Sequence, residues 1–130
     1  MNTTDTLPRS AGIAACVFAG TAVLAGAFGA HALRDRLGPE AMSIWHTAVE
    51  YQFWHALALF GISSLAQSED RGLRWALRSF VAGILLFSGS LYAIALGAPR
   101  LIGLLTPVGG LAFVAGWVCL ARFFVRSQTR

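Results

Sequence analysis

Long apolar stretches alternate with short polar connections along the chain. Four of these stretches, at about residues 11–33, 44–67, 77–97 and 106–125, have roughly the 20 residues that a helix needs to cross a bilayer. The connections at 34–38 and 68–72 are too short for anything but helical hairpins. The pattern predicts an all-α, integral membrane four-helix bundle with antiparallel, up-down-up-down order. We expect one transmembrane domain over residues 1–130.

The first apolar stretch also resembles a secretory signal peptide, because residues 30–32 (Ala-His-Ala) have the small-x-small pattern of a cleavage site. However, the apolar run is longer than the usual signal core of about 7–15 residues, and Arg9 is the only basic residue before it. We therefore expect a retained helix. Small residues at every fourth position, Ala22, Gly26 and Ala30, predict that this helix packs closely against another.

Three helix starts carry recognisable signals. Ser10 is a residue type that caps helix N-termini, and Pro39 suits the first position of a helix. Thr106 followed by Pro107 has the pattern of a cap and a first-turn proline. The apolar connection at 98–105 is expected to lie in the membrane surface.

Composition agrees with a membrane protein. Only 12% of the residues are charged and the mean hydropathy is +0.64, whereas soluble domains have about 25% charged residues. All basic residues are arginines, scattered between apolar spans without forming a patch, so we expect no nucleic-acid partner. Cys16 and Cys119 lie inside apolar spans and are expected to be packing residues rather than parts of a disulfide framework.

The arginines divide unevenly between the two ends of the predicted bundle. One end, with both termini and the second connection, holds Arg9, Arg71, Arg74, Arg78, Arg122, Arg126 and Arg130, and the other holds Arg34, Arg36 and Arg100. Because cytoplasmic loops are enriched in basic residues, we expect both termini in the cytoplasm.

The second apolar stretch contains an unusual concentration of polar side chains: His46, Glu50, Tyr51, Gln52 and His55. A charged side chain near the bilayer centre costs roughly 2.5–3.5 kcal/mol. The polar groups should therefore be paired with one another or line a small wet pocket. Because they lie on two faces of the helix, this helix should be central and contact neighbours on both sides.

Helix geometry predicts which polar groups share a level. At about 1.5 Å per residue, His31 and Tyr92 come near the level of Glu50, and Ser88 comes near that of His55. Thr106 caps the fourth helix at the outer rim. We therefore predict one binding or structural polar cluster in the outer half of the bundle, formed by His31, Glu50, Tyr51, Gln52, His55, Ser88, Ser90, Tyr92 and Thr106.

Candidate chemistry is limited. His31, His46 and Glu50 are weak candidates for a metal site, because there is no second carboxylate and no H-E-x-x-H motif; we expect no metal and no cofactor. A His–Glu pair could also relay protons. The segment Ser88-Gly89-Ser90 is not a nucleophile elbow, and we assign no catalytic residue.

Several motifs occur in a familiar order. They are Gly26-Ala27-Phe28-Gly29-Ala30-His31, Glu50-Tyr51-Gln52 with His55, Leu86-Phe87-Ser88-Gly89-Ser90-Leu91-Tyr92, Thr106-Pro107-Val108-Gly109-Gly110 and Gly116-Trp117. In these the chain resembles the YgdD-like family of small membrane proteins, a domain of unknown function, over nearly its whole length from Ala11 to Ala121. The resemblance implies four transmembrane helices and, for a bacterial member, the cell inner membrane. It implies no activity, substrate or cofactor, and His46 lies outside its motifs.

The sequence thus favours a small structural or partner-binding membrane component, with the bilayer and a membrane-protein partner or a second copy as its contacts. A first alternative is a transporter or channel-like protein for protons or a small polar solute. A second is an intramembrane enzyme that uses the His–Glu pair. We lean away from an enzyme because no motif assigns a catalytic group.

Overall fold

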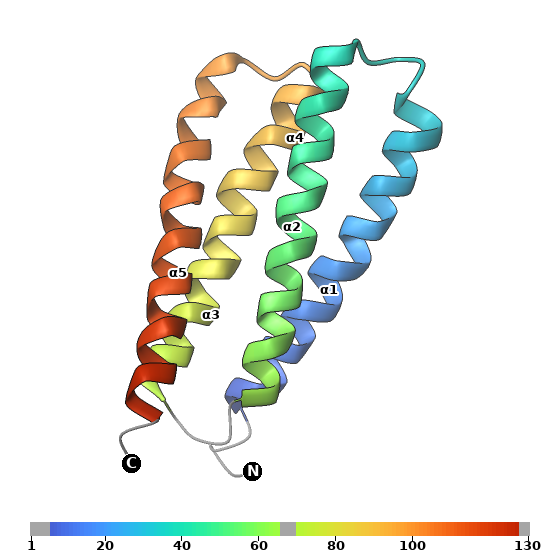
Figure 1. Ribbon diagram of the computed structural model, residues 1–130. Helices are drawn as coiled ribbons and strands as arrows, with labels where there is room; N and C mark the ends of the chain where they lie inside the picture. The colour runs from blue at the N-terminus through green and yellow to red at the C-terminus, as the bar shows by residue number, and fades with distance from the viewer. Residues whose placement is uncertain (1–5, 66–69, 128–130) are drawn as a thin grey trace.

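The computed structural model describes residues 6–65 and 70–127. This part of the chain is helical and contains no strand. In chain order the elements are α1 (Thr6–Phe28), the π-turn η2 (Gly29–Leu33), α2 (Pro39–Leu65), α3 (Arg71–Gly83), the π-turn η3 (Ile84–Ser88), α4 (Gly89–Ala95), the 3-10 turn η4 (Arg100–Leu104) and α5 (Leu105–Ser127). Because α3, η3 and α4 follow one another without a break, the described residues form four long rods (Figure 1).

The rods lie side by side, with α1 and α5 on opposite sides of the bundle (Figure 1). α1 packs along α2, and α3 packs along α5. α2 also contacts α3, η3 and α4, so it has neighbours on both sides. This is the central position expected from its two polar faces.

Among the described residues, three stretches are long and apolar enough to cross a membrane: Leu7–Leu33, Arg71–Ala95 and Arg100–Ser127. α2 is also 27 residues long, but it is not among the three, because its apolar run is interrupted by polar side chains. The apolar surface of the bundle agrees with a lipid environment. Large side chains such as Leu24, Leu101 and Leu111 are about 70% exposed, an arrangement that water would disfavour.

The helix ends differ in part from the sequence-based expectations. α2 begins at Pro39 as predicted. Ser10 does not cap α1; the helix begins four residues earlier, and the Ser10 hydroxyl donates to the carbonyl of Leu7 within it. The third rod begins at Arg71 rather than near Leu77, since Asp70 caps it by accepting hydrogen bonds from the backbone of the first turn.

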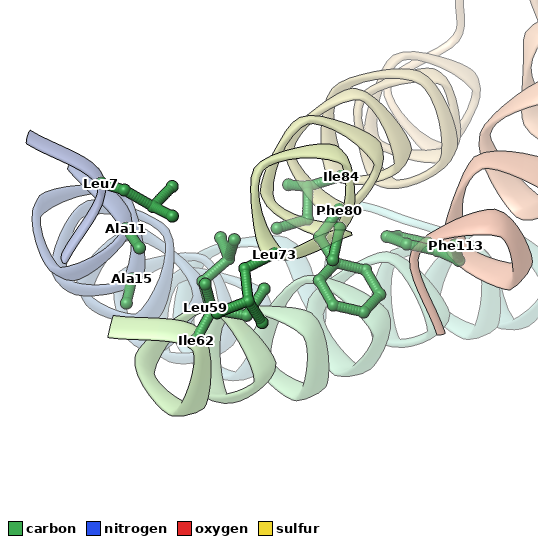
Figure 2. Packing of buried hydrophobic residues seen from close by; sticks show 10 residues of the cluster. Leu7, Ala11, Ala15, Leu59, Ile62, Leu73, Phe80, Ile84 and Phe113 are labelled. Atoms are coloured by element: carbon green, nitrogen blue, oxygen red, sulfur yellow. The ribbon is translucent and has the colours of Figure 1, made fainter. Parts of the chain in front are cut away.

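The inner core lies where all four rods approach one another (Figure 2). Ala11 and Ala15 of α1 are buried in the same cluster as Leu59 and Ile62 of α2. Small side chains on one helix let the other come close. Of the predicted series, Ala22 is buried and Gly26 lies beside Val49 of α2, whereas Ala30 is exposed.

Two phenylalanines fix the contact between α3 and α5 reciprocally. The ring of Phe113 on α5 covers Gly83 of α3, and the ring of Phe80 on α3 covers Gly116 of α5. A Cβ atom added to Gly116 would lie 2.5 Å from Phe80 Cε1. Each glycine therefore provides the space that the aromatic ring of the other helix fills.

Candidate functional site

Gln52 is the most connected polar side chain of the bundle. It lies on α2 and is 6% exposed. Its amide nitrogen donates to the carbonyl of Phe18 at 2.9 Å and to the hydroxyl of Thr21 at 2.8 Å, both on α1. Its amide oxygen accepts a hydrogen bond of 2.8 Å from the hydroxyl of Tyr92 on α4. One side chain thus joins three helices.

The hydroxyl of Thr21 confirms which end of the Gln52 amide is the nitrogen. Thr21 donates its proton to the carbonyl of Val17 at 2.8 Å, so toward Gln52 it acts as an acceptor. Both amide protons of Gln52 therefore go to α1, and the amide oxygen is left to accept from Tyr92. The arrangement is complementary on all three helices and leaves no donor of this amide free.

Trp45 supports the same junction from about two turns nearer the N-terminus of α2. Its indole N–H donates to the carbonyl of Ala25 on α1 at 2.9 Å. Its ring meets the ring of Tyr92 edge to face, with centroids 4.7 Å apart. Gly29 makes room for the indole, because a Cβ atom there would lie 2.6 Å from Trp45 Nε1.

His55 lies about one turn beyond Gln52 on α2 and is 5% exposed. Its Nδ1 is 2.7 Å from the carbonyl of Tyr51, and its Nε2 is 3.2 Å from the indole nitrogen of Trp117 on α5. A carbonyl only accepts and an indole N–H only donates. The ring is therefore neutral, with its proton on Nδ1. It stacks on Phe113 at a centroid distance of 3.6 Å, and both nitrogens are engaged by the protein.

Ser90 and Thr106 join α4 to α5. The Ser90 hydroxyl donates to the carbonyl of Phe87 at 2.9 Å, and its oxygen lies 2.6 Å from the hydroxyl oxygen of Thr106. Since the single proton of Ser90 goes to Phe87, Thr106 is the donor to Ser90. Ser88 differs: it is fully buried, yet its hydroxyl has no hydrogen-bond partner among the residues that the structure describes.

The side chains of the remaining predicted members, His31, Glu50 and Tyr51, form none of these hydrogen bonds. His31 and Glu50 are exposed, so the expectation that they are buried in one cluster with His55 is wrong. Tyr51 is half-buried, and its ring lies against Phe87 at a centroid distance of 4.5 Å. The polar groups therefore form three separate junctions, at Gln52, at His55 and at Ser90, rather than one layer.

Glu50 lies on the outward face of α2. This face, hereafter the α2 outer face, consists of exposed residues spaced three or four apart: Ser43, His46, Glu50, Trp54, Leu57, Phe60 and Ser64. Its first three residues in chain order are polar or charged, and Trp54, Leu57 and Phe60 follow them toward the C-terminus of α2. Within residues 6–65 and 70–127, no three His, Cys, Asp or Glu side chains gather as a metal site would require.

A groove of about 310 Å³ opens between α1, α2 and the α3–α4 rod. Phe18 and Leu85 form apolar walls, and Thr21, Gln52 and Tyr92 contribute its polar atoms. These are the same three residues that form the Gln52 junction. The groove is therefore a largely apolar space with a small polar floor, reached from the side of the bundle.

Three of the junction residues, Thr21, Trp45 and Trp117, were not predicted as site residues from the sequence. The two tryptophans look like interface and packing groups in an apolar helix, and Thr21 looks like a tolerated small residue. A signal did exist for Trp45. A glycine at position 29, in a helix expected to pack against the second span, indicates that a large side chain faces it.

Comparison with known proteins gives one consistent picture. Residues 25–110 match the family described as "Protein of unknown function (DUF423)". The UPF0382 membrane protein SH2409 of Staphylococcus haemolyticus is 44% identical over 95 residues, 73% of this chain and 78% of that protein. The UPF0382 membrane protein YwdK of Bacillus subtilis is 41% identical over 101 residues, covering 76% and 82%. The UPF0382 inner membrane protein YgdD of Escherichia coli is 40% identical over 109 residues, 83% of each chain. No solved structure matches the chain.

Proposed function

Because this chain belongs to the DUF423 family of membrane proteins of unknown function, we propose that it is a four-pass component of the bacterial inner membrane that binds another transmembrane protein through the α2 outer face. The hydrogen-bonded junctions inside the bundle hold its helices in register. The outward polar groups provide the contact with the partner. The chain forms one domain, with spans near residues 11–33, 44–67, 77–97 and 106–125.

Charge and geometry support an up-down-up-down topology with both termini in the cytoplasm. The connections after η2 and after α4 lie at one end of the bundle, and the start of α1 and the end of α5 lie at the other (Figure 1). The latter end carries most of the arginines, as cytoplasmic ends do. The relative YgdD is named as an inner membrane protein, and this supports the same location for this chain.

The exposed carboxylate of Glu50 is the observation that carries the proposal of a partner. Glu50 follows Trp45 by five residues, so it lies about 7–8 Å deeper along the helix axis. A carboxylate facing lipid costs about 2.5 kcal/mol or more at the bilayer centre, about 15 Å deep, and at the depth of Glu50 it bears part of that cost. A partner helix that donates hydrogen bonds to Glu50 would remove much of this cost.

The rest of the α2 outer face fits a helical partner. Trp54, Leu57 and Phe60 continue the face at helical spacing below Glu50. A stripe of this kind is how one transmembrane helix docks on another, with polar groups adding hydrogen bonds to the van der Waals contact. We commit to a different membrane protein as the partner, and a second copy of this chain is an alternative outcome of the test.

Photo-crosslinking in native membranes tests the proposal. A photoreactive residue in place of Trp54 is expected to give a discrete crosslinked band, whereas the same residue in place of Leu111, on the exposed surface of α5, is not. Glu50→Leu should weaken the band at position 54 while leaving the protein folded in detergent. A crosslinked band of twice the chain's mass would show that the partner is a second copy of this chain rather than a different protein. Equal labelling at both positions would overturn the proposal.

The groove gives the transporter alternative a specific basis. Its volume of about 310 Å³ is at the lower end of the range of small-molecule sites, which begins at about 300 Å³, and it places the Gln52 junction within reach of a solute. Gly89→Leu would fill the groove from a residue that lines it and at which an added Cβ atom would meet nothing within 4 Å. Loss of a cellular phenotype in this variant, with partner crosslinking intact, would favour solute binding.

A further inference from the structure

Five arginines gather at the end of the bundle where α3 begins and α5 ends. This arginine cluster consists of Arg71, Arg74 and Arg78 on α3 and Arg122 and Arg126 on α5. Trp75 lies among them, and the guanidinium of Arg78 is 5.5 Å from the centre of its ring. A cation over an indole face is attracted by the ring, so this pair holds one wall of the cluster in place.

The cluster encloses two adjoining clefts. One, of about 670 Å³, is lined by Arg71, Arg74, Trp75 and Arg78. The other, of about 270 Å³, is lined by residues of both helices, including Arg71, Trp75 and Arg122. The two clefts thus share Arg71 and Trp75 as a common wall and are open side by side.

One carboxylate, that of Asp70, lines the second cleft together with the arginines, and it is engaged by the backbone. Asp70 accepts hydrogen bonds from the backbone N–H groups of Gly72 at 2.6 Å and Leu73 at 3.2 Å, and so caps α3. Arg71, Arg78 and Arg122 outnumber this acid among the described residues that line the clefts. Glu69, the preceding acid in the sequence, lies outside the described residues.

The clefts lie where a lipid headgroup would be. Arg71 and Arg122 are near the ends of two stretches apolar enough to cross a membrane, and tryptophan next to arginine is typical of the headgroup level. Val118 lines the second cleft, and exposed apolar residues continue from it along α5, among them Val114 and Leu111. A lipid with its phosphates in the clefts would have apolar surface for its acyl chains.

From these observations we propose that the arginine cluster binds an anionic phospholipid with two phosphates in its headgroup. Guanidinium groups bind phosphate through paired N–H donors, and basic pockets between transmembrane helices suit such headgroups. Each cleft takes one phosphate, and the wall formed by Arg71 and Trp75 lies between them. Because there are two adjoining clefts, we expect a lipid with two phosphates to bind more tightly than a lipid with one.

The test uses the full-length chain, purified in detergent and depleted of lipid, with three probes: diphosphatidylglycerol, phosphatidylglycerol and inorganic pyrophosphate. Retained lipid is counted by native mass spectrometry and affinity is measured by titration. The double variant Arg71→Gln/Arg122→Gln is expected to weaken the binding of the diphosphate lipid about 30-fold. This figure follows from a loss of roughly 1 kcal/mol of binding free energy for each arginine near an anionic surface. The matched control Arg34→Gln/Arg36→Gln removes the same charge from the opposite end of the bundle and should leave the affinity unchanged.

The outcomes separate the proposal from its rivals. Binding of the diphosphate lipid at least tenfold tighter than phosphatidylglycerol, lost only in the Arg71/Arg122 variant, supports it. Equal losses in the two double variants would show a response to net charge and overturn it. Pyrophosphate binding as tight as the diphosphate lipid would assign the clefts to a free anion and also overturn it. A melting temperature close to that of the unaltered protein verifies that the variant is folded.

Discussion

The hydroxyl of Tyr92 donates a hydrogen bond to Oε1 of Gln52 across 40 positions of sequence, at 2.8 Å. The contact joins α4 to α2, and the same glutamine is bound to α1. In lipid, a polar side chain without a partner is costly, so the three helices are held at one relative height by the need to satisfy one amide. The pair is therefore a sensitive point at which to measure the register of the bundle.

Tyr92→Phe removes the hydroxyl and retains the ring that packs against Trp45. We expect a loss of about 0.6 kcal/mol in the free energy of unfolding, and at most about 1.7, the range measured for hydrogen bonds between transmembrane helices. Unfolding in mixed micelles measures it. In a double-mutant cycle with Gln52→Leu, the two losses should not add. Strict additivity would mean that the hydrogen bond contributes nothing.

The neutral state of His55 is also testable. With Nδ1 bonded to the Tyr51 carbonyl and Nε2 accepting from Trp117, nitrogen NMR should show a protonated Nδ1 and an unprotonated Nε2 at neutral pH. Trp117→Phe removes the donor and should shift the Nε2 resonance while Nδ1 stays protonated, with a stability loss of about 1 kcal/mol. A proton found on Nε2 would contradict the assigned tautomer.

Neighbouring glycines on α5 provide a matched pair. A Cβ atom at Gly109 would lie 2.8 Å from the Cα of Phe87, whereas one at Gly110 would lie 3.8 Å from the Phe87 ring. Gly109→Ala should push α5 away from η3 and cost about 1–3 kcal/mol. Gly110→Ala should be neutral or stabilising, because alanine favours a helix over glycine by up to about 1 kcal/mol. Thermal unfolding in detergent compares the two, and similar melting temperatures would contradict the contact at Gly109.

Two buried serines should respond in opposite ways. Ser90→Ala deletes the acceptor of Thr106 and should cost about 1 kcal/mol. Ser88→Ala removes a buried hydroxyl with no partner in the described part of the chain, so stability should stay the same or rise by about 1 kcal/mol or more. The same unfolding assay serves for both. A loss on Ser88→Ala as large as that on Ser90→Ala would show that the Ser88 hydroxyl is bound.

Sequence reasoning predicted the helices and the levels of several polar groups. The level predicted for Tyr92, near Glu50, agrees with its hydrogen bond to Gln52. Ser90 and Thr106, two members of the predicted nine-residue cluster, are bonded to each other. Depth follows from a fixed rise of about 1.5 Å per residue. A count along two spans was therefore enough to bring Tyr92 near the height of Gln52.

The direction in which each side chain points could not be counted in this way. Glu50 and Gln52 are two residues apart, so they differ by about 200° around the helix. When Gln52 faces α1 and α4, Glu50 must face outward. His46, one turn earlier in α2, lies on the same face as Glu50. Which of the two faces turned inward depended on where the neighbouring helices packed, and this information is absent from a single span.

The π-turn η3 sets how the two ends of its rod are rotated. Phe80, before η3, faces His55 of α2 with ring centroids 5.5 Å apart, and Tyr92, after it, faces Gln52 of the same helix. Twelve residues of regular α-helix would turn these two side chains about 120° apart, whereas a turn that absorbs one extra residue leaves them about 20° apart. The rod thus holds one residue more than its two contacts with α2 require. A relative that has one residue fewer in this interval could keep both contacts on an uninterrupted α-helix. Such a difference in length would leave the packing of the rod against α2 unchanged.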